Sequence, residues 1–322
     1  MKFLSNTYIL LIALLVFAFI DLVSGSINIF DSNTDVSTLI LELRLPRVLT
    51  GFATGGALSL CGLILQIIFR NPLAGPYVLG ISGAASLFAA IGIMSSGLLS
   101  GIFYQLGIGV FSILGALVGI VIILIALQIT SHTTIILLIG ILLSQLYSAI
   151  QSILSYISSE HSLKIYVIWT MGSIQNTDLW QSIILLIISI AGLTLILPFT
   201  RSLMGYITGD VNAQILGINI NRMKKQLVLM VAIIVGIFTA YCGPIALVGM
   251  SIPVLVRILH KSASVYQWII HTFLLGGLSV ILTDVINQIF FNGSLPLNVL
   301  ISIWGVPLMI WILIKQIKWV FI

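Results

Sequence analysis

The stretch PRVLTGFATGGALSLCGLILQIIF, residues 46–69, decides the fold of this chain. Its only charged side chain is Arg47, next to its first residue. A helix needs about 20 mainly apolar residues to cross the hydrocarbon core of a bilayer, so the stretch predicts a membrane-spanning helix. Gly51, Gly55 and Ser59 lie four residues apart in it, a spacing that lets helices approach closely and is typical of ordinary bundle packing in lipid.

The rest of the chain has the same character. Of 322 residues, 60% are apolar and 7% are charged, whereas soluble domains have about 45–50% and about 25%. This composition excludes a soluble globular protein and leaves no room for a separate soluble domain. We therefore expect an all-α, polytopic transmembrane helical bundle of about ten spans, forming a single domain over residues 1–322. Apolar runs and helix breakers place the spans near 3–23, 46–69, 77–97, 102–128, 134–157, 181–200, 226–242, 244–260, 268–290 and 297–314.

Two of these assignments have alternatives. The apolar run 3–23 lies between Lys2 and the small residues Ser24 to Ser26 and could be a secretory signal, but it is long enough to span a bilayer and no clear small-x-small cleavage site closes it. We interpret it as a retained first span. The segment 226–260 is short for two crossings, and Gly243, Pro244 and Pro253 are expected to bend or break its helices.

The basic residues predict the orientation. With a cytoplasmic N-terminus, ten of the 13 lie inside and three, Arg44, Arg47 and Lys164, lie outside, which is a positive-inside bias. Both termini are then cytoplasmic. The inside set is Lys2, Arg70, Arg201, Arg222, Lys224, Lys225, Arg257, Lys261, Lys315 and Lys318. Because these cations are scattered between apolar runs, nucleic acid is not an expected partner.

The sequence contains no recognisable catalytic, phosphate-binding or metal-binding motif. It has no metal-binding HExxH, no GxSxG nucleophile turn and no phosphate-binding loop, and Cys61 and Cys242 sit in apolar runs. No catalytic, cofactor or metal site is therefore expected. Asp284 is the one ionisable residue well inside a predicted span. It is either a hydrogen-bonded carboxylate near the helix end or part of a proton relay. A chain with so few such groups would take the energy for active transport from another polypeptide.

The longest polar stretch predicted on the cytoplasmic side covers residues 201–225. Thr208 or Asp210 can cap a short helix over 211–216, and Gly217 suits a left-handed stop at its C-terminal end. Such a helix is either a docking surface for a partner or a mere connector, and the pattern alone favours neither.

Motifs in order along nearly the whole chain resemble the permease family of bacterial type II ABC importers for iron-siderophores, haem and cobalamin, the FecCD-type permeases. The motif residues are Pro46, Gln66, Asn71, Pro72, Gly80, Gly83, Trp169, Gly172, Pro253, Arg257 and Asp284. The second half departs from the family pattern at Val254, Gln288 and Asn298, which stand where histidine, arginine and glycine are common.

This resemblance implies a permease subunit of an ATP-driven importer in the bacterial cytoplasmic (inner) membrane. Its expected partners are a second permease subunit, two cytoplasmic ATPases that bind the ATP and magnesium, and one extracytoplasmic substrate-binding protein. By resemblance, Gly209, Asp210, Ala213, Leu216 and Gly217 belong to a coupling helix that rests in a groove of the ATPase. The cargo would be an iron chelate, haem or cobalamin, and the dimer homo- or heteromeric.

Arg44 and Arg47 have two interpretations. They are expected to emerge on the extracytoplasmic side, where local ion pairing with Asp31, Asp35 or Glu42 would explain them. The family resemblance instead implies that they dock glutamates of the binding protein, as rim charges that make association salt-sensitive.

Two other function classes remain open. An ion-coupled secondary transporter would use the proton gradient instead of a partner ATPase. A polytopic membrane enzyme would need acidic or nucleophilic residues clustered at one membrane depth, and the sequence offers none. For the importer, Gln145, Tyr147 and Ser148 of the fifth span are candidates for the pathway of the chelate.

Overall fold

The computed structural model describes residues 2–25, 38–77, 79–94, 102–130, 132–260 and 263–320, and the regular structure in these ranges is helical. Asp31, Asp35 and Lys261 lie outside the described residues, as do the side chains of Lys2, Lys315 and Lys318. The places of these residues in the charge patterns above stay predictions.

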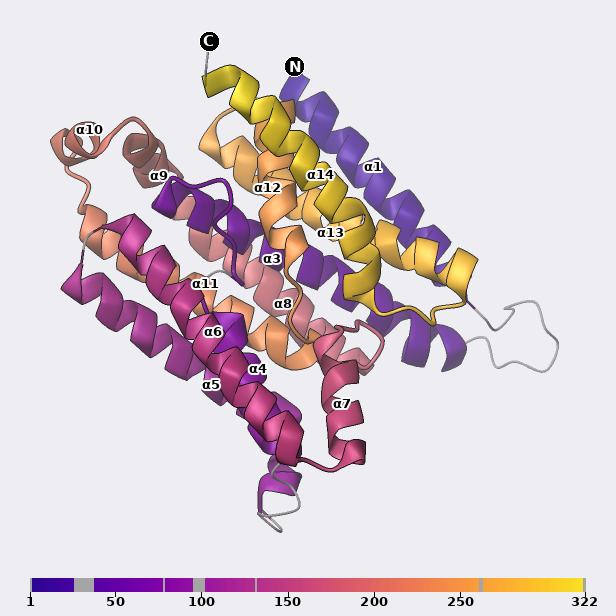
Figure 1. Ribbon diagram of the computed structural model, residues 1–322. Coiled ribbons are helices and arrows are strands. Elements are labelled where there is room, and N and C mark those ends of the chain that lie inside the picture. Colours follow the sequence, from indigo (N-terminus) through magenta and orange to yellow (C-terminus); the bar gives the residue numbers. More distant parts are fainter. Residues whose placement is uncertain are drawn as a thin grey trace. The chain divides into compact units, whose positions relative to one another are not determined.

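In the part of the chain that the structure describes, a helix lies at each of the ten predicted spans. Figure 1 shows how these helices are arranged along the chain. They are α1 (Lys2–Val23), α3 (Leu45–Phe69), α4 (Ile81–Met94), α5 (Ile102–Ile129), α6 (Thr133–Ile157), α8 (Leu179–Ile196), α11 (Ile220–Cys242), α12 (Leu247–Leu259), α13 (Val265–Phe291) and α14 (Leu297–Val320). Within the described ranges, seven helical segments are long and apolar enough to cross a membrane, and Thr7–Val23, Ile81–Met94 and Leu247–Leu259 are shorter apolar helices. The predicted fold class, an all-α transmembrane bundle, is confirmed.

Short elements join some of these helices. A π-helical turn, η1 (Leu39–Arg44), leads into α3, and α7 (Glu160–Thr170), which the sequence analysis missed, lies between α6 and α8. The 3-10 turn η2 (Leu197–Phe199) continues α8 into α9 (Thr200–Ile207), and α10 (Asp210–Ile215) precedes α11.

Helix α4 begins later than the predicted span 77–97. The chain first turns after α3, where the Asn71 side-chain oxygen accepts a hydrogen bond from the Leu73 N–H at 2.9 Å and the Asn71 carbonyl accepts one from Ala74. An asparagine that bonds the backbone two residues on favours a turn over a helix. The motif residues Asn71 and Pro72 therefore shape the exit from α3.

The break between α11 and α12 lies at Gly243, as the sequence suggested. Gly243 has a φ of +74°, and a Cβ there would overlap the Trp169 carbonyl oxygen, so the position requires glycine. The Ser173 N–H donates to the Cys242 carbonyl at 2.9 Å beside it. The prediction of two helices in 226–260 is confirmed, but α11 begins at Ile220 and Pro253 lies inside α12 without ending it.

The chain divides into two compact units. Unit 1 comprises Met1–Leu63, Ile174–Leu197 and Leu247–Ile322. In it α13 packs against α1, α12 and α14, and glycines bring α3 close to its neighbours: a Cβ on Gly55 would overlap the Gly276 carbonyl of α13, and one on Gly62 the Gly249 carbonyl of α12. Close backbone approach of this kind replaces the hydrophobic effect as a source of cohesion in lipid.

Unit 2 comprises Ile64–Ser173 and Pro198–Ala246. Its centre is α4, which packs against α5, α6, α7 and α11. A Cβ on Gly115 of α5 would overlap the Ala84 carbonyl of α4, so Gly115 lies on a packing face between these two helices. The short helix α10 contacts α9 and α11.

Candidate functional site

The polar segment between α8 and α11 folds into two short helices, α9 and α10. Tyr206 in α9 is 2% exposed, and its hydroxyl donates to the Ile68 carbonyl near the end of α3 at 3.1 Å. Arg70, the residue after α3, donates to the Tyr206 carbonyl at 3.0 Å, and its guanidinium carbon lies 4.4 Å from the Tyr206 ring centroid. Tyr206 thus fastens the segment to the end of α3.

The first residue of α10 completes this link. The Asp210 carboxylate forms an ion pair with Arg70, and both side chains are about half exposed, at 53% and 47%. The sequence analysis used Arg70 only as an orientation charge and gave Tyr206 no role. Tyr206 is the one aromatic residue of segment 201–225, and that is the signal that could have marked it.

The end signals of α10 were predicted in part. Gly209 is the residue before the helix and no side chain caps it, so the expected caps Thr208 and Asp210 are wrong: the Thr208 hydroxyl donates backwards to the Gly205 carbonyl at 2.8 Å. The left-handed stop at Gly217 is confirmed by its φ of +76°. The helix covers 210–215, one residue earlier than predicted.

Helix α10 presents apolar side chains to solvent. Val211, Ile215 and Leu216 are 70%, 78% and 68% exposed, while Ala213 is buried against the rest of unit 2. Val211 and Ile215 are four residues apart and therefore share one face of the helix. Adjacent exposed apolar side chains in a connection between helices make this face a candidate contact surface for another molecule.

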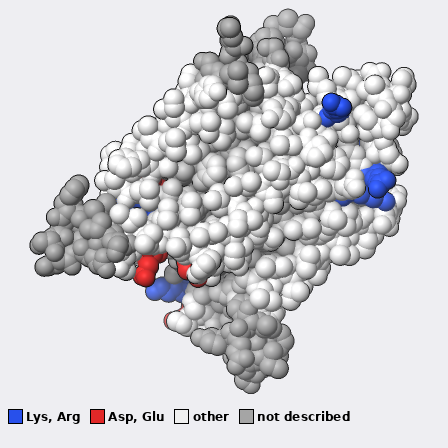
Figure 2. All heavy atoms as spheres, turned by 180° about the vertical axis from the view of Figure 1, so that it is seen from behind, with Lys and Arg blue, Asp and Glu red and all other residues white. Residues whose placement is uncertain are grey.

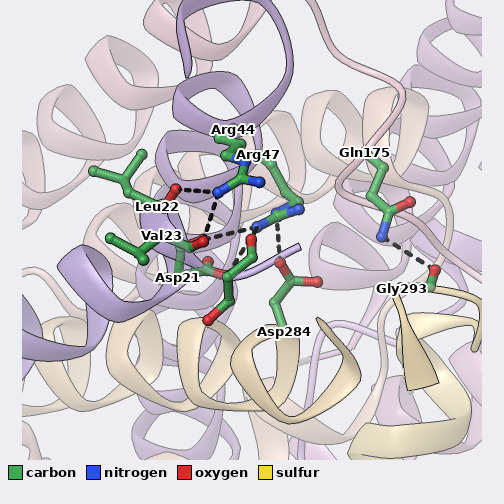
Figure 3. A network of polar contacts seen from close by, with 9 residues as sticks. Asp21, Leu22, Val23, Arg44, Arg47, Gln175, Asp284 and Gly293 are labelled. Atoms are coloured by element: carbon green, nitrogen blue, oxygen red, sulfur yellow. Dashed lines mark hydrogen bonds and ion pairs between the residues drawn. The ribbon is translucent and has the colours of Figure 1, made fainter. Parts of the chain in front are cut away.

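The second candidate site is a buried charge cluster in unit 1, drawn in Figure 3. Arg47 of α3 lies between two aspartates, with its Nη2 3.1 Å from Asp21 Oδ1 of α1 and its Nε 2.7 Å from Asp284 Oδ2 of α13. Residues Asp21, Asp284 and Arg47 are 0%, 1% and 8% exposed. The cluster thus ties three helices together through one guanidinium group.

Arg44, one turn before Arg47, closes the C-terminal end of α1. Its Nη1 donates to the carbonyls of Leu22 and Val23 at 2.9 and 2.6 Å, as Figure 3 shows, and the residue is 3% exposed. The last carbonyls of a helix have no partner within it and carry partial negative charge, so a cation there is stabilising. Arg44 thus has a structural role within unit 1.

These contacts change the picture drawn from the sequence. Arg44 and Arg47 are not on an exposed rim, because carboxylates and carbonyls inside the unit satisfy them. The ion-pairing interpretation describes Arg47, whose partners in the described residues are Asp21 and Asp284. Glu42 is exposed, and pairing with Asp31 or Asp35, which lie outside the described residues, stays a prediction. Their role in docking stays a prediction. Asp21 was missed, although a lone acid near the end of the apolar run 3–23 signals a buried partner.

The remaining motif residues have structural surroundings. Gly80 and Gly83 face α6, where added Cβ atoms would lie 3.0 Å from the Gly140 carbonyl and 3.3 Å from the Tyr147 ring. Gly172 lies against Gly243 at the α11–α12 break. The other five have little or partial exposure: Pro46, Gln66 and Pro253 are buried, and Trp169 and Arg257 are intermediate.

Two of the three pathway candidates on α6 are open to the surroundings. Gln145 and Ser148 are exposed, whereas Tyr147 is 7% exposed and packs in a core cluster with Ala84 and Leu87 of α4. Tyr147 therefore does not line an open path in this conformation. Exposed polar side chains at mid-helix favour a water-filled cavity or a protein contact over lipid.

In the part of the chain that the structure describes, no group of three or more histidine, cysteine or carboxylate side chains is placed to hold a metal ion. The rings of His260 and His271 do lie close together, with centroids 4.6 Å apart and planes tilted by 46°, and Thr7 Oγ1 lies 3.0 Å from His271 Nε2.

The curated proteins to which this chain is similar include transport permeases. The chain is 32% identical over 289 residues to the hemin transport system permease protein HmuU of Yersinia pestis, covering 86% of this chain and 83% of HmuU. It is 31% identical over 281 residues to the vitamin B12 import system permease protein BtuC of Klebsiella pneumoniae, covering 86% and 82%. A solved structure described as a metal-chelate type ABC transporter in an inward-facing conformation superposes with a TM-score of 0.86 at 26% identity, over 97% of this chain and 99% of that one.

The sequence profile of the FecCD transport family matches residues 7–315, nearly the whole chain. Together with the apolar helices in the described ranges, this match makes the chain a multi-pass membrane protein. The resemblance inferred from the motifs is therefore confirmed: the chain belongs to the FecCD transport family.

Proposed function

We propose that this chain is the membrane-spanning permease subunit of an ATP-driven importer whose cargo is an iron chelate, haem or cobalamin. The relatives named for hemin and vitamin B12 support the cargo class, since both cover more than four fifths of this chain. The chain itself supplies the passage, and partner ATPases supply the energy. It binds no ATP or magnesium in this proposal, and catalyses no hydrolysis.

The observation that carries the proposal is the exposed apolar face of α10. A six-residue helix lies between two membrane-length helical segments, Leu179–Ile207 and Ile220–Cys242, and holds Val211 and Ile215 out to solvent. Such a face needs a hydrophobic groove on a partner to cover it. A cytoplasmic ATPase is the partner that fits an importer driven from outside the chain.

The mechanism we infer is alternating access. ATP-driven closure of the two ATPases moves α10, and the contacts of Tyr206 and Arg70 pass that movement to the end of α3. A helix bundle with two packed states then opens its passage to one side of the membrane at a time. Exposed Gln145 and Ser148 of α6 are candidates to line that passage beside a second permease subunit. An extracytoplasmic binding protein delivers the cargo, and both termini are cytoplasmic.

Substitutions on α10 test the coupling. The variant V211S/I215S removes the apolar face, and N212S/Q214S changes two exposed polar residues of the same helix as a matched control. We expect V211S/I215S to lower ATP-driven uptake and ATPase retention at least tenfold. In the proposed complex the ATPase covers Val211 and Ile215, and burying an apolar side chain contributes about 1.5–3 kcal/mol to the free energy of association. The control should stay within about twofold in vesicles containing the permease, ATPase and binding protein. Normal uptake and ATPase retention in V211S/I215S would refute the coupling role.

One observation favours a second candidate, an ion-coupled secondary transporter. Ionisable groups buried within a membrane protein are costly and often serve proton or ion movement, and Asp21, Arg47 and Asp284 form such a group. Uptake in vesicles that persists with a hydrolysis-deficient ATPase, and stops when the proton gradient is collapsed, would identify this class. Uptake that needs ATP hydrolysis and survives an uncoupler would identify the ABC importer.

A further inference from the structure

A cavity of about 520 Å³ lies in unit 2 between α9, the residues that follow α10, and the first turns of α11. Its apolar lining comes from Phe199, Leu216, Ile218 and Met223. Its polar lining comes from Arg201, Ser202, Asn219, Arg222 and Gln226. This volume is at the scale of a small-molecule binding site.

The charge of this cavity is uncompensated. No aspartate or glutamate lines it, and neither Arg201 nor Arg222 forms an ion pair with a carboxylate in the described ranges of the chain. The neighbouring cavity of about 870 Å³ is different, since there Arg70 is paired with Asp210. Two exposed arginines facing one polar hollow attract an anion.

The start of α11 adds to this attraction. Its first turns carry Arg222, Lys224 and Lys225 and no acidic residue, although the N-terminal end of a helix is itself positive. The Asn219 side-chain oxygen accepts a hydrogen bond from the backbone N–H of Arg222 at 3.0 Å and so caps one of the free N–H groups at the start of α11. Asn219 is neutral, however, and adds no negative charge. An anion bound in the cavity would offset both the helix dipole and the cations.

The exposed face of α11 shows what kind of anion fits. Arg222, Gln226, Leu229 and Ile233 follow at intervals of four, three and four residues, so they lie along one face of the helix. The two polar members line the cavity, and the two apolar members, 40% and 43% exposed, continue the same face into the membrane span Ile220–Cys242. A ligand matching this face has an anionic head and an apolar tail.

We propose that this cavity binds the headgroup of an anionic phospholipid between Arg201 and Arg222, with an acyl chain lying along Leu229 and Ile233. Basic pockets beside membrane helices are sites of this type. The guanidinium groups hold the phosphate, and Ser202 and Gln226 hydrogen-bond the rest of the headgroup. The lipid would brace the chain between α10 and α11. This inference is independent of the transported cargo, because it concerns the membrane itself.

The test measures lipid binding to the full-length permease by native mass spectrometry after exposure to an equal mixture of phosphatidylglycerol and phosphatidylcholine. We expect the wild type to retain phosphatidylglycerol preferentially, and R222Q to lower that retention about fivefold, the effect of about one surface charge. K225Q is the matched control: it removes one charge from the same part of α11, but Lys225 does not line the cavity. It should change retention less than twofold. R222K, which keeps the charge, should retain most of the preference.

Three results would overturn the proposal. Equal losses in R222Q and K225Q would reduce the effect to general attraction between the basic surface and the lipid. Displacement of phosphatidylglycerol by millimolar inorganic phosphate would assign the cavity to a free anion, since the acyl chain would then contribute nothing. Loss of the lipid when the ATPase is added, with R222Q weakening ATPase retention, would assign the arginines to a protein contact.

Discussion

The two ends of α3 carry the same chemistry in opposite surroundings. At its start, Arg47 is 8% exposed and shared between the buried carboxylates of Asp21 and Asp284. Just after its end, Arg70 pairs with Asp210, with both side chains about half in solvent. An exposed pair contributes about 0–1 kcal/mol, whereas removing one partner of a buried pair leaves an uncompensated charge and costs about 3–5 kcal/mol.

The difference suggests a division of labour along one helix. The buried cluster fixes α1, α3 and α13 in one arrangement, because separating the helices would leave its charges unpaired and without solvation by water. The exposed pair can break and re-form at little cost, since solvent replaces either partner. A link that has to transmit movement from α10 needs the second property, and a core that has to keep its packing needs the first. The sparse charge of the molecule makes both sites stand out; most of the surface in Figure 2 carries no charged side chain.

The largest expected effect comes from R47M. The substitution keeps an unbranched apolar chain and removes the cation, leaving Asp21 and Asp284 facing each other without a partner. We expect the free energy of unfolding to fall by about 3–5 kcal/mol. Titration with a denaturing detergent, followed by helix content, measures this loss. R70M, the same change just after the other end of α3, is the matched control and should lose less than R47M, because water replaces the half-exposed contacts that Arg70 makes with Asp210 and Tyr206.

Removing the carboxylates as well tests the cause of that loss. In R47M/D21N/D284N no buried charge is left uncompensated, so part of the lost stability should return. A triple variant no more stable than R47M would mean that Arg47 acts through its packing and its bonds to the Asp21 and Ser24 carbonyls instead of through charge.

A smaller effect is expected from D284N alone. Arg47 keeps the ion pair with Asp21, so one charged contact is lost and a neutral amide takes the place of the carboxylate. We expect a loss of about 1–3 kcal/mol, the range for one hydrogen bond to a charged group. The same detergent titration gives the value, and D178N, at the exposed capping position before α8, controls for an Asp-to-Asn change outside the cluster. A loss as large as that of R47M would show that Asp21 cannot compensate Arg47 by itself.

The helices could be predicted from the sequence because each apolar run has the length of a membrane crossing. Such a run can be recognised without knowing which other segments pack against it. Where the prediction failed, the local signal was weak or was overridden. Helix α7 was missed because Glu160–Thr170 is short and mixed in character, and the start of α4 was misplaced because apolar residues continue through the turn before Gly80. Gly217 was predicted correctly, since a helix stop depends on one residue.

The charge cluster could not be predicted, for a physical reason. The cluster forms only because α1 and α3 both pack against α13 in the folded chain. The residues next to Asp21, Arg47 and Asp284 in the sequence do not indicate which charged side chain each will contact. From the sequence alone, Arg47 lies near a predicted loop and was therefore expected to face solvent. The sequence did contain one usable hint: Asp21 and Asp284 are lone acids in apolar runs, and acids so placed need a cation.

The smallest effect on stability and the most informative effect on function are expected from D210N. The substitution removes the charge that pairs with Arg70 but keeps the side-chain shape, while Tyr206 still holds the segment through its bond to Ile68. The free energy of unfolding should change by less than about 1 kcal/mol, and the change should shrink further in high salt, which screens exposed charges. Transport per ATP hydrolysed should nevertheless fall severalfold, because α10 would then move without drawing the end of α3 with it. Uptake and ATP hydrolysis measured together in reconstituted vesicles give this ratio. The reverse pair, R70D/D210R, restores opposite charges and should recover part of it; a ratio unchanged in D210N would show that the link through Tyr206 suffices for coupling.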